Sequence, residues 1–191
     1  RYTLATGDRI AMDIDPNSGR LIYSLIGYQW PNPSKVPPQF IKNGVATKPY
    51  EHIISFFSAD APESTQPIGV GINNDICFSQ PAVSPDGGSL LVTAGKYKGS
   101  GEFEPKVLLV MPAAANGMQQ ASPLYPPRDK GLGETIWSPH WSPDGKKICF
   151  ALVSKDSKTH SICVLDKDGG NFKNLTEGKG NFSSPVFSPQ Q

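Results

Sequence analysis

Residues 139–150 carry the sequence PHWSPDGKKICF, which is the strongest indication of the fold in this chain. The same pattern recurs at residues 81–92, PAVSPDGGSLLV, and in a degenerate form at residues 12–23, MDIDPNSGRLIY. A fourth copy, PVFSPQQ, begins at Pro185. Each copy has an apolar side chain two residues before a proline, then a turn; in the first three copies an apolar run follows. Such recurrence predicts tandem units of one supersecondary structure.

Each copy predicts a β-hairpin. Proline has no N–H to give to a strand ladder, so it suits the end of a strand. Asp86 and Asp144 can accept a backbone hydrogen bond in the turn, and Gly87 and Gly145 can adopt a positive φ at low cost. Asn17 stands where Asp is found in the other copies and tolerates the same conformations. We therefore expect these five residues to be structural turn residues.

The apolar position before each proline predicts a core site between neighbouring units. It is filled by Ile14, Val83, Trp141 and Phe187 in the four copies. Because side chains alternate along a strand, these four should point to the same face of their hairpins. They are the predicted structural core.

Every unit reads as four antiparallel strands. The predicted strands are 9–14, 20–26, 52–59 and 66–70, then 79–84, 89–95, 106–111 and 122–125, then 138–142, 147–154, 161–166 and 172–176. The units thus span residues 9–70, 79–125 and 138–176, and the first strand of a fourth lies in 183–191. The chain has 191 residues, with 19 Gly and 19 Pro. A composition so rich in turn formers excludes a helical bundle and predicts an all-β fold.

Residues 27–50 interrupt the first unit between its second and third strands. Five prolines in this segment disfavour helix and central strand, and indicate a long loop. Loops of this length often bind ligands. The aromatic side chains Tyr28 and Trp30 are therefore candidate binding residues.

Four-stranded units in tandem are typical of β-propeller blades. Residues 139–176 resemble the TolB-type, WD-repeat-like propeller repeat, because S-P-D-G and an apolar strand are followed by a strand ending in Asp, then D-G-G and N-L-T. Residues 81–92 resemble its first half. The resemblance implies blades around a central channel, with the first strand of each blade innermost. TolB-type rings usually hold six blades, so it also implies a three-blade fragment, completed by further blades of the same polypeptide or by another chain.

The resemblance implies a non-catalytic scaffold that recognises protein or glycan partners through loops at the channel mouth, in the periplasm or outside the cell. The alternative is the propeller domain of an enzyme. It could belong to a prolyl-oligopeptidase-like peptidase whose catalytic domain lies outside this chain, or resemble a polysaccharide lyase. The compartment cannot be read from the residues themselves, and a cytoplasmic location stays open.

No residue is predicted to be catalytic, and no metal or cofactor is expected. The sequence contains no G-x-S-x-G, P-loop or H-E-x-x-H motif. Asp13, Asp15 and Asn17 lack the spacing of an EF-hand calcium loop. His140 is a candidate binding residue in a predicted innermost strand, where alternation points it away from Trp141. Lyases that resemble this family place metal-binding histidines near the channel, but a solvated or hydrogen-bonded His140 is the simpler interpretation.

Charge and apolar runs exclude two classes of partner. Lys plus Arg is 18 and Asp plus Glu is 17, so the net charge of +1 gives no field for capturing nucleic acid. The basic stretch around Lys96, Lys98 and Lys106 has Glu102 and Glu104 interleaved, and we interpret it as a solvated hairpin tip. No apolar run approaches the length of about 20 residues that a membrane-spanning helix needs, so no membrane insertion is predicted.

The three cysteines, Cys77, Cys149 and Cys163, show no C-x-x-C spacing. We expect three buried free thiols that pack as small apolar side chains. A disulfide between Cys149 and Cys163 would join neighbouring strands of one hairpin, where the geometry is usually strained.

Overall fold

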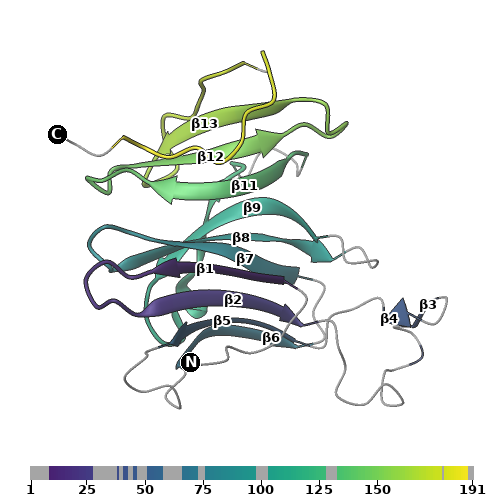
Figure 1. Cartoon of the computed structure of the whole chain (residues 1–191), viewed down its shortest axis with the longest axis vertical. Helices are drawn as coiled ribbons and strands as arrows, with labels where there is room; N and C mark the ends of the chain where they lie inside the picture. Colours follow the sequence, from purple (N-terminus) through teal and green to yellow (C-terminus); the bar gives the residue numbers. More distant parts are fainter. Residues whose placement is uncertain are drawn as a thin grey trace.

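A computed structural model gives the arrangement of the chain. It describes residues 9–27, 38, 41–42, 45–46, 51–57, 66–72, 76–97, 103–127, 133–177 and 179–188. Three four-stranded antiparallel sheets follow one another along the chain (Figure 1). No α-helix occurs in these ranges, and none of the helical turns there is long and apolar enough to cross a membrane. The predicted all-β fold is confirmed.

The first sheet has the strand order β1-β2-β5-β6. Its strands are β1 (Arg9–Ile14), β2 (Leu21–Gly27), β5 (Glu51–Phe57) and β6 (Gln66–Ile72). The long connection between β2 and β5 contains a separate two-stranded hairpin, β3 (Ile41–Lys42) and β4 (Val45–Ala46). This hairpin was not predicted, because the prolines of the segment indicated a loop. Figure 1 shows this hairpin standing apart from the sheet.

The second sheet has its strands in chain order from β7 to β10. They are β7 (Ile76–Val83), β8 (Ser89–Tyr97), β9 (Phe103–Pro112) and β10 (Ser122–Tyr125), with a 3-10 helix, η3 (Gly117–Gln120), between β9 and β10. Leu90 and Val92 of β8 face the first sheet, whereas Leu91 faces the third. The apolar run of β8 is therefore buried on both faces, as in a middle layer.

The third sheet has the order β11-β12-β13-β14. Its strands are β11 (Thr135–Trp141), β12 (Lys147–Val153), β13 (His160–Asp166) and β14 (Lys173–Asn174). The last strand is much shorter than the predicted 172–176. Asn174 Oδ1 accepts hydrogen bonds from the backbone N–H groups of Thr176 and Glu177, and these bonds turn the chain away from the sheet.

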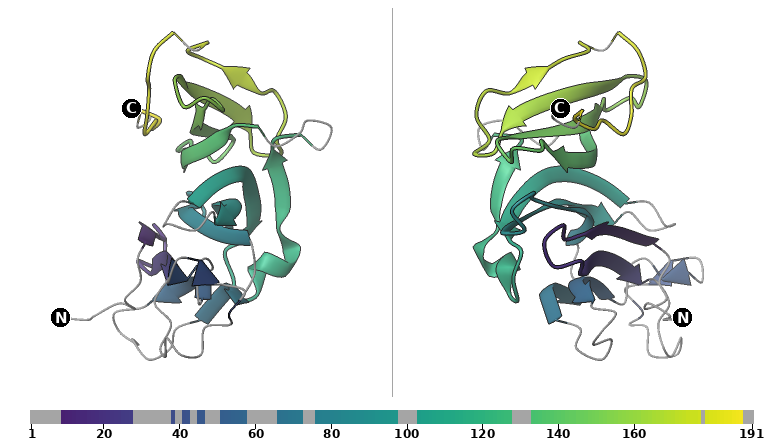
Figure 2. Two further views of the ribbon diagram at one scale, coloured as in Figure 1. Left: turned by 90° about the vertical axis from the view of Figure 1, so that its right-hand side faces the viewer. Right: turned by 60° about the vertical axis from the view of Figure 1, so that its left-hand side comes forward.

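The sheets stack face to face, with the second between the first and the third (Figures 1 and 2). One apolar cluster joins Ile22 and Ile68 of the first sheet to the second sheet. The other joins the second sheet to the third, and has the fully buried Phe150 among its members. Burial of these faces is the main source of stability for the stack.

The predicted core positions have different surroundings. Val83 is buried against the first sheet, and Trp141 is half-buried against the cluster between the second and third sheets. Phe187 is half-buried. No described residue buries Ile14, whose side chain is 59% exposed. The reason is geometric: Val83 and Trp141 each pack on the preceding sheet, and Ile14 lies in the first sheet described.

The S-P-D-G turns form as predicted. In the second sheet, Ser84 Oγ donates to Asp86 Oδ1 over 2.5 Å and accepts from the N–H of Ser89 over 2.9 Å. The N–H of Gly88 also donates to Asp86 Oδ1, and Gly87 has φ +72°. The turn between β11 and β12 repeats these bonds with Ser142 and Asp144, and Gly145 has φ +67°. Residues 154–159 form the same turn without proline or glycine.

The first turn is built differently, which corrects the role given to Asn17. Asp15 takes the place of the serine, and its carboxylate accepts from the Asn17 N–H and from the Ser18 hydroxyl. The positive φ moves one position along, to Gly19. Asn17 does not cap its own turn. Its side chain donates to Pro85 O in the neighbouring turn over 3.3 Å, because the turns of the first and second sheets lie against each other.

This contact between turns predicts a difference among three glycines with similar φ values. A Cβ on Gly87 would lie 2.7 Å from Asn17 Nδ2 and 2.9 Å from Asp15 Oδ1, whereas Gly19 has nothing within 4 Å. Gly19→Ala should lower the free energy of unfolding by about 1–2 kcal/mol, through the positive φ alone. Gly87→Ala should cost about 1–2 kcal/mol more, because the hydrogen bonds of Asp15 and Asn17 must shift. Urea unfolding of both variants measures the difference.

Gly145→Ala is the matched control for that comparison. Its Cβ would meet only Pro85 Cδ at 3.7 Å, an ordinary contact, so it should behave like Gly19→Ala. Equal losses for all three variants would show that the turns of the first two sheets do not touch.

The turn carboxylates predict a loss of stability in acid. In Asp86, Asp144 and Asp156 the hydroxyl of the serine two positions earlier, with a backbone N–H, holds the pKa below its usual value. A depressed pKa stabilises the folded state above the unfolded value of about 3.9, and this contribution is lost as the pH falls through the folded pKa. The melting temperature should therefore change little from pH 7 to 5 and fall below pH 4.

Calorimetry across this range tests the acid prediction. The triple variant with Asn at positions 86, 144 and 156 should melt at a lower temperature at pH 7 and lose less on acidification. An unchanged slope in that variant would assign the acid sensitivity to other groups, such as Asp166, whose pKa is lowered mainly by its hydrogen bond from Lys147.

The C-terminal segment 179–188 runs across the outer face of the third sheet (Figure 1). The N–H of Phe182 donates to His160 O of β13, and the Cys149 thiol of β12 lies 3.6 Å from Pro185 O. No strand forms at 183–188. Ser184 nevertheless has a positive φ of +51°, close to those of Gln80 (+53°) and Ser138 (+51°), the residues before the equivalent prolines. The backbone at Ser184 thus has the conformation that precedes the equivalent prolines in the second and third sheets.

Candidate functional site

Side-chain and backbone hydrogen bonds join β1, β7 and β11, the first strands of the three sheets. Asp13 Oδ2 of β1 accepts from the N–H of Val83 in β7 over 2.8 Å. Gln80 Oε1 of β7 accepts from the N–H of Ser138 in β11 over 2.6 Å. The indole N–H of Trp141 donates to Ala82 O over 3.0 Å. These bonds hold the sheets in one register along their first strands.

His140 lies exposed on β11, opposite Cys149 of β12. The equivalent residues in the repeats are Asp13 and Ala82, and both contact the first strand of the following sheet. His140 therefore lies where a following sheet would pack. Side-chain alternation along β11 did not predict this neighbour. The other two candidate binding residues, Tyr28 and Trp30, lie outside the described residues.

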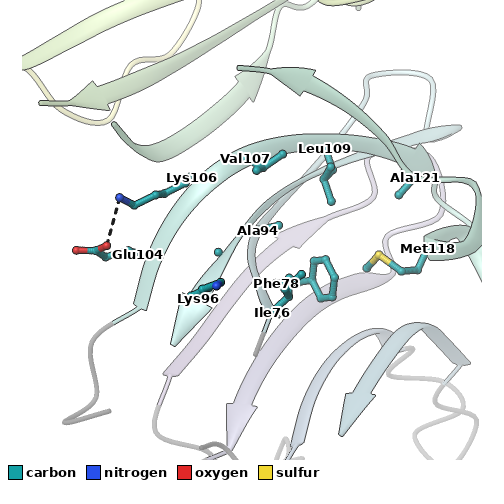
Figure 3. A pocket seen from close by; sticks show the side chains of 11 residues that line it. Ile76, Phe78, Ala94, Lys96, Glu104, Lys106, Val107, Leu109, Met118 and Ala121 are labelled. Atoms are coloured by element: carbon teal, nitrogen blue, oxygen red, sulfur yellow. Dashed lines mark ion pairs between the residues drawn. The ribbon is translucent and has the colours of Figure 1, made fainter. Parts of the chain in front are cut away.

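A cavity of about 760 Å³ lies on the face of the second sheet that is turned toward the first (Figure 3). Its apolar wall comes from β7, β9, η3 and the residue that follows η3: Ile76, Phe78, Val107, Leu109, Met118 and Ala121. Lys96, Glu104 and Lys106 lie toward one end of the cavity, and Met118 and Ala121 toward the other. The cavity is thus apolar along its body and charged at one end.

The charged end is built by a close approach of β8 and β9. Their register shifts between Ala94 and Gly95, and a Cβ on Gly95 would lie 1.8 Å from Glu104 O. Only glycine fits there. Because such a bulge re-aims the side chains beside it, the consecutive residues Lys106 and Val107 both line the cavity instead of facing opposite sides.

Sequence reasoning missed this cavity. It interpreted the stretch around Lys96 and Lys106 as a solvated hairpin tip, yet Phe103 is only 4% exposed and Lys106 is half-buried in an ion pair with Glu104, 3.5 Å long. The one available signal was Gly95 in an otherwise apolar strand, since an isolated glycine there indicates a bulge or a close backbone approach.

The three cysteines are free and buried, as predicted. Cys163 points into the cluster between the second and third sheets, whereas Cys149 faces the C-terminal segment. Their side chains lie on opposite faces of the sheet, which excludes the alternative disulfide. Burial raises the pKa of Cys149 to about 11 and that of Cys163 to about 12, so both stay protonated at neutral pH. Within the described ranges, no three His, Cys, Asp or Glu side chains gather as a metal site would require.

Comparison with solved structures identifies the architecture. A TolB from Agrobacterium tumefaciens matches with a TM-score of 0.57 and 15% identity, over 90% of this chain and 50% of that one. A TolB from Acinetobacter baumannii matches with a TM-score of 0.50 and 19% identity, over 88% and 32%. Together with the stacked four-stranded sheets, these matches decide the fold. The chain is a segment of a β-propeller. Its three sheets are blades 1, 2 and 3.

Sequence comparison adds less to this assignment. The uncharacterized protein Atu1656 of Agrobacterium fabrum is 34% identical over 70 residues, which cover 32% of this chain and 23% of that protein. No family model matches. A chain in a nidogen/laminin complex matches the propeller segment with a TM-score of 0.51 and 14% identity, over 87% and 47%. The chain spans about a quarter of the curated relative and half or less of these structures.

Proposed function

We propose that this propeller segment is a binding scaffold without a catalytic centre of its own, and that it recognises a protein or a glycan at one end of its blades. The observation that supports this is a difference between the two ends. At one end, the turns after β7 and β11 repeat the same hydrogen bonds, and the turn after β1 is a variant with Asp15 in place of the serine. At the other end, the connection 28–50 is far longer than its equivalents 98–102 and 154–159. Variable loops on a rigid scaffold are where propellers and similar folds carry recognition.

At the repeating end, the polar side chains of the S-P-D-G turns form hydrogen bonds within their own turns. The carboxylates of Asp86 and Asp144 accept hydrogen bonds from the serines two positions earlier in the same turns. The same turn recurs once at the variable end, at Asp156 in the connection 154–159. The longest connection at that end carries the β3–β4 hairpin, with Ile41 44% exposed. A partner that uses this end would contact this hairpin.

A photo-crosslinker tests the binding surface directly. p-Benzoylphenylalanine is placed at position 41 in cells that produce the protein. If the partner is a protein, illumination should give discrete covalent adducts. If the partner is a glycan, immobilised glycans should retain the chain. The same residue at position 146, in the repeating turn of blade 3, should give no adducts. Equal adducts at both positions would contradict recognition through the variable end.

Two observations distinguish the alternative function, a propeller domain of an enzyme, from a non-catalytic scaffold. They are catalytic turnover by the chain and the sequence of the full reading frame. Depolymerisation of a polysaccharide by the chain, lost in His140→Ala, would overturn the non-catalytic proposal. A G-x-S-x-G motif in a neighbouring α/β domain would assign the propeller to a peptidase. The periplasmic or secreted location belongs to the same proposal, and localisation of the tagged full-length protein in cell fractions tests it.

We also propose that further blades of the same polypeptide cover the open face of blade 1. Met12 and Ile14 are 55% and 59% exposed on β1, at a face that the other blades bury against a neighbour. Exposed large apolar side chains that lie together on one face indicate an interface.

A further inference from the structure

The cavity on blade 2 is too large to be a packing defect. Protein interiors hold few voids larger than a water molecule, whereas sites for small molecules measure roughly 300–1,000 Å³. At about 760 Å³ this cavity falls in the second range. Phe78 and Met118 line it and are only half-buried, so an occupant with an apolar body would complete their packing.

The charged end adds a preference for an anion. Lys96 and Glu104 are directly opposite each other in the β8–β9 register, and Glu104 pairs with Lys106 over 3.5 Å (Figure 3). Among the described residues that line this end, two ammonium groups and one carboxylate leave one positive charge. Lys96 is exposed and forms no ion pair with a residue in the described ranges. This end of the cavity therefore complements one negative charge.

We propose that the cavity binds a small amphipathic anion, whose apolar body lies between Phe78 and Met118 and whose single negative head group lies between Lys96 and Lys106. The bulge at Gly95 allows a charged and an apolar side chain to line the same cavity, because it brings Lys106 to the cavity beside Val107. This site is separate from the variable loops of the proposed function.

A matched pair of probes separates the two parts of the proposal. 1-Anilinonaphthalene-8-sulfonate has an aromatic body and one negative charge, and N-phenyl-1-naphthylamine has the same body without the sulfonate. Fluorescence titration of the 191-residue chain should give saturable binding of both at one site per chain. The anionic probe should bind about three- to tenfold more tightly, as expected for a part-exposed ion pair.

Charge variants then test the head-group end. Lys96→Met and Lys106→Met should each weaken the sulfonate probe about three- to tenfold and leave the neutral probe within twofold. Glu104→Gln should tighten the sulfonate probe. Lys158→Met, at an exposed lysine in the connection 154–159, is the matched control and should change neither.

Ala121→Trp tests the apolar end by filling it, and should weaken both probes at least tenfold. If that variant loses its native circular dichroism, the smaller Ala121→Leu serves instead and should weaken both probes at least threefold. Three results would overturn the proposal: binding that does not saturate, equal affinity for the two probes, or charge variants that change both probes alike. None of these outcomes bears on crosslinking at position 41, so the two proposals fail independently.

Discussion

Phe150→Ala should lower the free energy of unfolding by about 3–5 kcal/mol, the loss expected when a fully buried aromatic side chain is truncated in a core. Phe150 is 0% exposed and belongs to the cluster that joins blades 2 and 3. Its ring centroid lies 5.3 Å from that of Tyr125 and 6.4 Å from that of Phe172. The truncation would therefore remove aromatic contacts with two other segments as well as apolar area.

Urea unfolding monitored by far-ultraviolet circular dichroism measures this loss. Phe150→Leu is the control, and should cost less than half as much because it keeps most of the buried volume. A loss below about 1 kcal/mol for Phe150→Ala would contradict the packing of blade 2 on blade 3.

Trp141→Ala should lower the free energy of unfolding by about 2–4 kcal/mol, somewhat less than Phe150→Ala because Trp141 is only half-buried. Two effects contribute. The ring leaves the cluster between blades 2 and 3, and Ala82 O loses the indole N–H that donates to it. Loss of that partner leaves a buried carbonyl unsatisfied, at a cost of about 1–3 kcal/mol.

Trp141→Phe separates the two effects. It keeps an aromatic ring and removes only the donor, so it should show the hydrogen-bond part of the loss alone. A Trp141→Phe variant as stable as the parent, or a Trp141→Ala variant that loses less than about 1 kcal/mol, would remove Trp141 from the contact between the blades.

The hairpins could be predicted from the sequence because their determinants are local. Ser84, Asp86 and Gly87 form their bonds within one turn, so the letters S-P-D-G determine the turn wherever they occur. The apolar runs after each turn then give the middle strands. With β14 as the exception, the four-stranded units followed from repeating this pattern.

The rest depends on contacts between segments that are distant in sequence. The side chain of Asn17 donates to the next turn, 68 residues away, and no local rule contains that partner. The position of Ile14 predicts a core residue only when a blade precedes it. The cavity combines residues of three strands and η3, brought together by the close approach at Gly95, so its size and its charged end could not be predicted from any single motif.

The central claim is that the chain is an arc of propeller blades in which β1 faces a neighbouring blade, as β7 and β11 do. Sedimentation velocity of the 191-residue chain over a hundredfold range of concentration tests it most directly. We predict a sedimentation coefficient that rises with concentration, because Met12 and Ile14 are uncovered in the isolated chain. The double variant with Lys at positions 12 and 14 should sediment as a monomer, and Val186→Lys, at an exposed position in the C-terminal segment, should still associate. A parent chain that is monomeric at every concentration and unfolds in one sharp transition would contradict the claim.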